Sequence, residues 1–121
     1  MSRDYSLYID DIKESCGRII EYVAGLSREE FFNDRKTYDA VVRNLTVIGE
    51  AVKSLPAELR TQFSNVEWTK IARFRDITVH RYWSLDETII WDIVQNKVPE
   101  LLTNVSTAEG AKPESKTSSE Q

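Results

Sequence analysis

The stretch YDAVVRNLTVIGEAVKSL, residues 38 to 55, carries the pattern that decides the fold. Its apolar side chains recur at steps of three and four residues, which places them on one stripe of an α-helix and predicts packing as in a helical bundle. Pro56 follows directly and suits the first turn of a further short helix in PAELRTQF. The stripe consists of Tyr38, Val41, Leu45, Ile48, Val52 and Leu55.

The region before this stretch predicts another long amphipathic helix. Between residues 5 and 23 the apolar side chains again recur in threes and fours, and Gly25 is placed to end the helix. Ser27 and Glu30 then have the form of a capping box, which predicts the start of a short helix carrying two phenylalanines. The stripe of the long helix consists of Tyr5, Tyr8, Ile9, Ile12, Cys16, Ile19, Ile20 and Val23.

Two more long helices are expected in the second half of the chain. Ser64 and Glu67 repeat the capping-box spacing before one of them, and Ser84 and Glu87 repeat it before the other. Pro99 should kink the last helix or restart it at the preceding turn. The apolar residues of that last helix are Ile89, Ile90, Ile93, Val94, Val98, Leu101 and Leu102.

The composition favours one globular domain. The chain has 121 residues, of which 40% are hydrophobic and 30% charged. From residue 105 the sequence is polar and small, so we expect a domain over residues 1–104 and a disordered tail over residues 105–121. No strand-period alternation competes with the helical patterns. The expected fold class is therefore all-α, a bundle of four main helices with one or two short ones.

Several features bear on location and partners. No apolar stretch approaches the roughly 18 residues of a membrane span, and the N-terminus lacks the apolar core of a signal peptide. The single cysteine, Cys16, cannot form an internal disulfide and is expected to be a buried small side chain. We therefore expect a cytoplasmic protein without a membrane partner. The net charge of −4 argues against non-specific coating of nucleic acid, so any contact with nucleic acid must be local.

The residues best suited to chemistry lie in RFRDITVHRYW, residues 73 to 83. Arg75 offers a planar fork that can hold a phosphate with two hydrogen bonds, and His80, the only histidine, titrates near neutrality. Both suit RNA cleavage in which the 2′-hydroxyl attacks the adjacent phosphate. This route needs no metal, and the sequence offers no HxxxH or CxxC pair as a metal site. A separate acid must protonate the leaving oxygen, so one histidine per chain favours a dimer with a shared site.

Helical geometry leaves two interpretations of this stretch open. On an ideal helix Arg75 and His80 lie about 140° apart, so the helix must end or loosen before Ser84, or a second chain must supply one of the two. Asp76 lies one turn before His80 and could orient its imidazole. Taken alone, however, the spacing fits a solvated polar face better, with the arginines exposed and His80 a boundary residue.

The stretch also resembles a known family. Arg75, His80 and Tyr82 form the Arg-x4-His-x-Tyr pattern of the HepT branch of the HEPN superfamily. Two longer segments are similar as well, RNLTVIGEAVKSLPAELR (residues 43–60, with the "GEA" helix) and WTKIARFRDITVHRYWSLD (residues 68–86). The likeness covers roughly residues 5 to 102, which is nearly the whole expected domain.

The resemblance implies a dimeric helical bundle that acts as a metal-independent endoribonuclease without a cofactor, the toxin of a type VII-like toxin–antitoxin pair. Arg75 would stabilise phosphate charge, His80 would serve in acid–base catalysis, and Asp76 would support the site. Tyr82 would receive AMP from a partner nucleotidyltransferase (MNT-domain) antitoxin, which would silence the ribonuclease by adding bulk and negative charge. Arg73 is a further candidate for contact with RNA phosphate.

Other interpretations stay open beside this one. Glu50 in the GEA segment could be solvated or could face the site. Trp68 and Trp91 are expected to anchor the core or a dimer interface rather than to stack on RNA. The chain could also be a non-catalytic helical partner, or nucleotide-presenting subunit, of a nucleotidyltransferase, although the intact Arg75 and His80 count against this.

Overall fold

The computed structural model describes residues 3–79 and 87–111, with side chains for residues 6–75 and 87–106, and is helical throughout both ranges apart from short turns. Its four longest helices are α1 (Arg3–Val23), α3 (Arg35–Lys53), α5 (Trp68–Val79) and α7 (Val98–Ala111). Shorter elements are α2 (Arg28–Asn33), α4 (Ala57–Gln62), α6 (Glu87–Asp92) and the π-helical turn η2 (Ile93–Lys97). Within these ranges no strand occurs, so the predicted all-α class with four main helices is confirmed, with three short α-helices instead of one or two.

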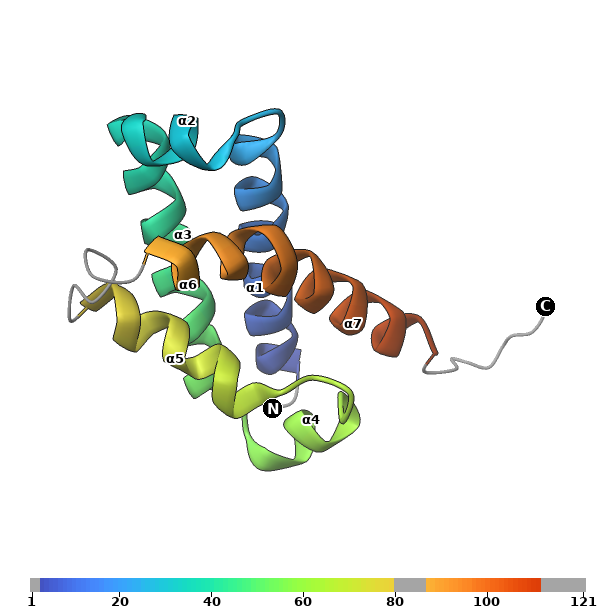
Figure 1. Cartoon of the computed structure of the whole chain (residues 1–121). Helices are drawn as coiled ribbons and strands as arrows, with labels where there is room; N and C mark the ends of the chain where they lie inside the picture. The colour runs from blue at the N-terminus through green and yellow to red at the C-terminus, as the bar shows by residue number, and fades with distance from the viewer. Residues whose placement is uncertain (1–2, 80–86, 112–121) are drawn as a thin grey trace.

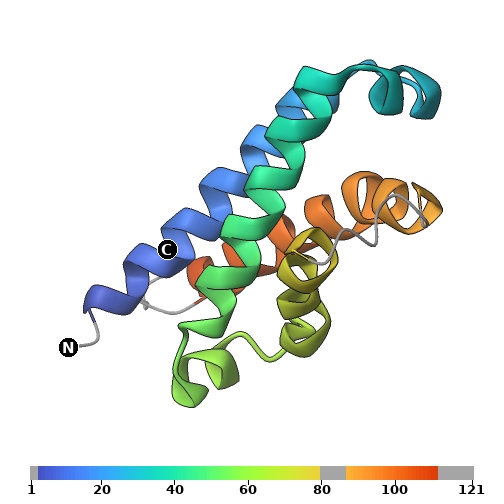
Figure 2. The same cartoon turned by 90° about the vertical axis from the view of Figure 1, so that its left-hand side faces the viewer.

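Helix α3 holds the central position in the bundle. It lies beside α1 in both views and makes its other extensive contact with α5 (Figures 1 and 2). Helix α7 packs on α1, and the chain from α6 to α7 lies on the same side of the α1–α3 pair as α5 (Figure 2). The position of α5, which carries the candidate motif arginine, therefore depends on α3.

The predicted apolar stripes meet in one core. From α1, Ile12, Cys16 and Ile19 are fully buried, and from α3 Val41 and Ile48 are too. Such burial favours folding by roughly 1.5–3 kcal/mol for each large aliphatic side chain. None of the described helices combines the length and the apolarity that a membrane crossing requires.

Two aromatic groups close the ends of this core. Phe31 of α2 is fully buried, and its ring centroid lies 5.6 Å from that of Trp91 and 4.8 Å from that of Phe32. At the other end, the ring centroids of Phe63 and Trp68 lie 6.2 Å apart, edge to face. Trp68 is buried and Trp91 partly buried against the core, as expected for core anchors.

The helix ends follow the sequence signals in the first half of the chain. Ser27 and Glu30 form the predicted capping box, with bonds of 3.1 Å and 2.9 Å between each side chain and the other residue's backbone N–H. Gly25 adopts φ +80°, a left-handed conformation that favours glycine and that follows the end of α1. Pro56 stands at the N-cap of α4.

The capping box predicted at Ser64 is wrong. Helix α5 begins only at Trp68, and the segment before it forms a turn in which the Val66 N–H donates to the Phe63 carbonyl at 3.0 Å. The same carbonyl accepts the Trp68 indole N–H at 3.2 Å. Because Phe63 and Val66 are both buried, core packing holds this turn against the local helix-start signal. The other predicted start, Ser84, lies outside the described residues.

Pro99 restarts the last helix, which is one of the two outcomes expected for it. The Val98 N–H donates to the Ile93 carbonyl across five residues, and α7 then begins with Pro99 in its first turn, where its missing N–H is tolerated. The helix continues to Ala111, and Val105 is fully buried. The tail boundary expected at residue 105 is therefore too early, because Val105 extends the stripe of Val98 and Leu101.

The buried thiol of Cys16 gives a first prediction. Burial raises the pKa of this thiol to about 12, so at pH 8 roughly one thiol in ten thousand is ionised in the folded chain. We expect an aromatic disulfide reagent to label the native protein very slowly and the denatured protein rapidly, measured by absorbance. The variant Cys16→Ser gives the zero-labelling control. Rapid, complete labelling of the native chain would show that the thiol is accessible.

Candidate functional site

The candidate site begins with a close approach of two helix backbones. Gly49 is buried on the side of α3 that faces α5. A Cβ atom added at Gly49 would lie 2.5 Å from the Cβ and 2.7 Å from the backbone N of Arg75. No side chain fits in that space, so glycine here sets how closely α5 approaches α3. The contact also fixes which residue of α5 lies opposite this turn of α3.

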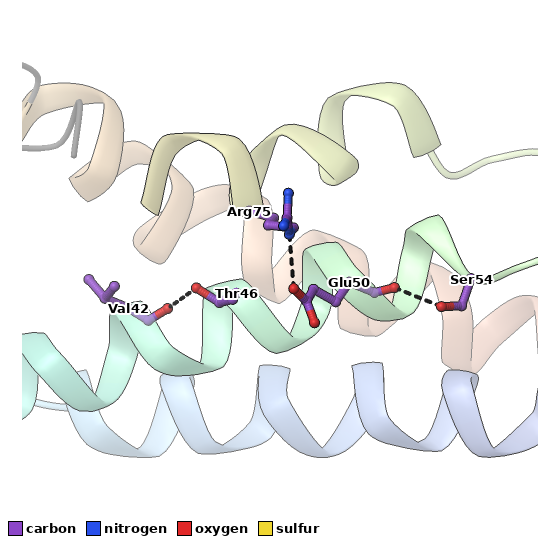
Figure 3. Close-up of polar contacts among 5 residues, drawn as sticks. All are labelled: Val42, Thr46, Glu50, Ser54 and Arg75. Carbon is purple, nitrogen blue, oxygen red and sulfur yellow. Dashed lines mark hydrogen bonds and ion pairs between the residues drawn. The ribbon is translucent and has the colours of Figure 1, made fainter. Parts of the chain in front are cut away.

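The residue next to Gly49 holds the side chain of the same arginine. The Nε–H of Arg75 donates to Oε2 of Glu50 at 2.9 Å, a charge-assisted hydrogen bond between α5 and α3 (Figure 3). The side chain of Arg75 is 34% exposed and that of Glu50 is 59% exposed. The pair therefore lies at the solvent edge of the α3–α5 contact, where the guanidinium is held and yet reaches the surface.

Glu50 belongs to a row of residues on one side of α3. Val42, Thr46 and Glu50 follow one another at four-residue intervals along the helix, and Ser54, its C-cap, continues the row (Figure 3). The hydroxyl of Thr46 donates to the Val42 carbonyl at 3.1 Å, and that of Ser54 donates to the Glu50 carbonyl at 3.1 Å. These two hydroxyls bond to their own helix, whereas Glu50 reaches across to α5.

The motif arginine, Arg75, and the further candidate Arg73 lie on different sides of α5. Arg75 faces α3, whereas the exposed Arg73 lines a cavity of about 320 Å³ together with Lys70 and Lys97, between α5 and the η2–α7 segment. Residues two positions apart on a helix point about 200° apart, so this separation follows from helical geometry. Arg73 and Arg75 are therefore not brought together, and an RNA contact by Arg73 requires a strand that passes around α5.

The other predicted site residues are not placed. The backbone of Asp76 belongs to α5, but its side chain lies outside the described part of the structure, as do His80 and Tyr82 entirely. Among the side chains that the structure describes, those of residues 6–75 and 87–106, no three of His, Cys, Asp or Glu gather as metal ligands.

From the sequence, the role of Glu50 stayed open, and Gly49 was not recognised as a functional position. Glu50 fitted either a solvated position or a site-facing one, and it bonds to the motif arginine. Gly49 stood out only as a member of the GEA segment. A glycine inside a predicted helix costs about 1 kcal/mol relative to alanine, and that cost was the available signal for a close backbone approach.

Comparison with known protein families identifies the family of this chain from its sequence. Residues 12–108 match the family model described as "Ribonuclease HepT-like", a range that contains Gly49, Glu50 and Arg75. The chain belongs to the ribonuclease HepT-like family. The resemblance drawn from the motif is thereby confirmed.

Relatives of the HepT-like family carry ribonuclease names. A protein named "Putative RNase" from Methanocaldococcus jannaschii is 43% identical over 97 residues, covering 80% of each chain. One of the same name from Caldanaerobacter subterraneus subsp. tengcongensis is 43% identical over 94 residues, covering 78% of this chain and 84% of the relative. The "Probable ribonuclease HepT" of Thermococcus cleftensis is 35% identical over 101 residues, covering 84% and 92%. No solved structure gives a significant match.

The Gly49 contact predicts opposite effects of alanine at two glycines of this HepT-like chain. In Gly49→Ala the new methyl group meets the α5 backbone, and such overpacking costs up to roughly 3 kcal/mol, against a gain of about 1 kcal/mol in helix propensity, so we expect a net loss of roughly 1–2 kcal/mol. Gly17, inside α1, has no atom within 4 Å of an added Cβ, so Gly17→Ala should be neutral or stabilising. Urea unfolding measures both free energies. Equal or greater stability of Gly49→Ala would contradict the close approach.

Proposed function

We propose that this chain is a metal-independent endoribonuclease whose active site forms between two copies of the chain. The observation that carries the proposal is membership of the ribonuclease HepT-like family together with an arginine, Arg75, that is held at the surface by Glu50. The ribonuclease names of the relatives support RNA as the substrate. The chain needs no cofactor in this scheme, and we place it in the cytoplasm.

In the proposed reaction the RNA supplies its own nucleophile. A base removes the proton of the 2′-hydroxyl, the O2′ atom forms a bond to phosphorus, and the bond from phosphorus to O5′ breaks. An acid gives the departing O5′ its proton, so the products end in a 2′,3′-cyclic phosphate and a 5′-hydroxyl. Arg75 opposes the negative charge that builds up on the phosphate oxygens. His80 exchanges the protons, and Asp76 supports it.

The need for both an acid and a base explains the proposed dimer. Each chain has one histidine, and one imidazole cannot readily remove a proton and supply another in the same step. Two chains side by side would bring two copies of His80 and two of Arg75 to one phosphate. Arg73, on the other side of α5, would add affinity for a longer RNA strand.

We further propose that the chain is the toxin of a type VII-like toxin–antitoxin pair. Its antitoxin would be an MNT-domain nucleotidyltransferase that attaches AMP to Tyr82. A bulky anion two residues from His80 would block the site and repel RNA phosphate. This part of the proposal is supported by the Arg-x4-His-x-Tyr pattern of the sequence.

The first test is cleavage of RNA by the purified chain. We expect Arg75→Ala to lower kcat/KM by roughly 10²–10³ and His80→Ala by roughly 10²–10⁴, because each removes a group that acts in the transition state. Arg35→Ala is the matched control, since Arg35 is a highly exposed arginine of α3 that pairs with Asp39. A chelator should leave the rate unchanged, and end-group analysis should find the cyclic phosphate.

Two results would overturn this assignment. Full cleavage by both variants would exclude Arg75 and His80 from the site, and loss of cleavage with the chelator would exclude a metal-independent mechanism. A chain that binds a nucleotidyltransferase but cleaves no RNA would instead be the non-catalytic helical partner.

The second test addresses Tyr82. After co-expression with a nucleotidyltransferase encoded beside its gene, the chain should gain the mass of one or more AMP units and lose its cleavage activity. Tyr82→Phe should gain no AMP and stay active in the presence of that enzyme, because it lacks the acceptor hydroxyl. Intact-mass spectrometry measures the modification. AMP addition that persists in Tyr82→Phe would assign the site to another residue.

A further inference from the structure

We propose that Glu50 is a positioning residue that orients the guanidinium of Arg75 for transition-state contact with the scissile phosphate. The inference rests on the proposed ribonuclease function, which it deepens by naming what aligns the catalytic arginine. Two neighbouring residues of α3 act on Arg75 in different ways. Gly49 sets the distance between the two backbones, and Glu50 sets the direction of the side chain.

The geometry of the bond supports this role. An arginine side chain that is one-third exposed can adopt many rotamers, and a hydrogen bond at 2.9 Å to a carboxylate selects among them. Glu50 accepts from the Nε–H of Arg75 (Figure 3). In any guanidinium the two Nη groups form a different edge from the one that carries Nε. That Nη edge carries parallel donors suited to two oxygens of one phosphate. Glu50 therefore directs phosphate toward the Nη edge of the guanidinium.

Stability does not explain the pair. Both side chains are partly or largely exposed, and exposed ion pairs contribute little to folding free energy because water and salt screen them. The α3–α5 contact is already fixed by the buried residues around Gly49. The orientation of one side chain, by contrast, has a large effect on rate, since a misplacement of about 1 Å can cost a hundredfold.

The carboxylate of Glu50 should also weaken RNA binding, and this effect makes the proposal testable. Its negative charge lies beside the group that would bind phosphate, so it repels RNA. Glu50→Gln removes the charge and keeps an oxygen that can accept from Nε–H. Glu50→Ala removes both the charge and the acceptor, and Glu50→Asp keeps the charge on a side chain one methylene shorter.

The experiment compares steady-state cleavage of a short RNA by the full-length variants. We expect Glu50→Gln to keep kcat within about threefold of the wild type and to lower KM, whereas Glu50→Ala and Glu50→Asp lose roughly 10- to 100-fold in kcat. The matched control is Glu14→Ala, because Glu14 pairs with Arg18 on α1 at 2.8 Å and with similar exposure. Glu14→Ala should leave kcat unchanged, and the melting temperatures of all these variants should stay close to that of the wild type.

Two outcomes would overturn the proposal. Unchanged kcat in Glu50→Ala would reduce the pair to a surface contact. An equal loss in Glu50→Gln and Glu50→Ala, with a limb of the pH–rate profile removed, would make Glu50 an acid–base group instead of a positioning residue.

An NMR measurement tests the orienting role of Glu50 independently of the proposed ribonuclease function. The Nε–H resonance of Arg75, assigned by its loss in Arg75→Lys, should show slow exchange with water in the wild type and in Glu50→Gln, and fast exchange in Glu50→Ala. If the wild type cleaves no RNA but shows this pattern, the ribonuclease assignment fails and the orienting role of Glu50 stands. If the exchange rate is the same in all three proteins, the orienting role fails.

Discussion

The contact between Gly49 and the backbone of Arg75 is the constraint on which the candidate site depends. Without a Cβ at this turn of α3, the two helices approach until the backbone of one meets the other, and this fixes α5 both in distance and in register. Because α3 also packs along α1, the same helix connects the candidate site to the centre of the core. A shift of α5 by one residue would turn Arg75 away from Glu50 by about 100°.

Rigid helices, and not loops, hold the two charged side chains that meet at the site. Glu50 extends from a helix whose neighbouring turns contribute Ile48 and Val52 to the core, so its backbone has little freedom. Arg75 follows Phe74, which is buried. Each charged side chain thus stands beside an apolar anchor on its own helix. Functional groups supported in this manner keep their geometry better than groups on mobile segments.

The sequence predicted the parts of the fold that depend on local pattern. The apolar stripes of α1 and α3, the capping box at Ser27 and the restart at Pro99 all arise from side chains a few residues apart. The boundary before Val105 could have been placed later, because Val105 continues the local stripe of Val98 and Leu101. The false start at Ser64 was decided by packing of Phe63 and Val66 in the core, which no local signal contains. The partner of Glu50 was hidden for the same reason, since it lies 25 residues away along the chain. The separation of Arg73 from Arg75 could have been predicted, because it needs only the helical repeat.

In the proposed reaction, the negative charge of Glu50 beside Arg75 would act on the rate of RNA cleavage more than on the affinity for RNA, in a chain whose net charge is −4. A chain with this charge attracts RNA weakly at long range, and Glu50 adds a further negative charge at the place where a phosphate would bind. In the ground state that charge works against binding. In the transition state the phosphate carries more charge in defined directions, and a guanidinium already aligned with those directions gains more than a freely rotating one. A carboxylate at this position can therefore weaken substrate binding and still raise the rate of the chemical step.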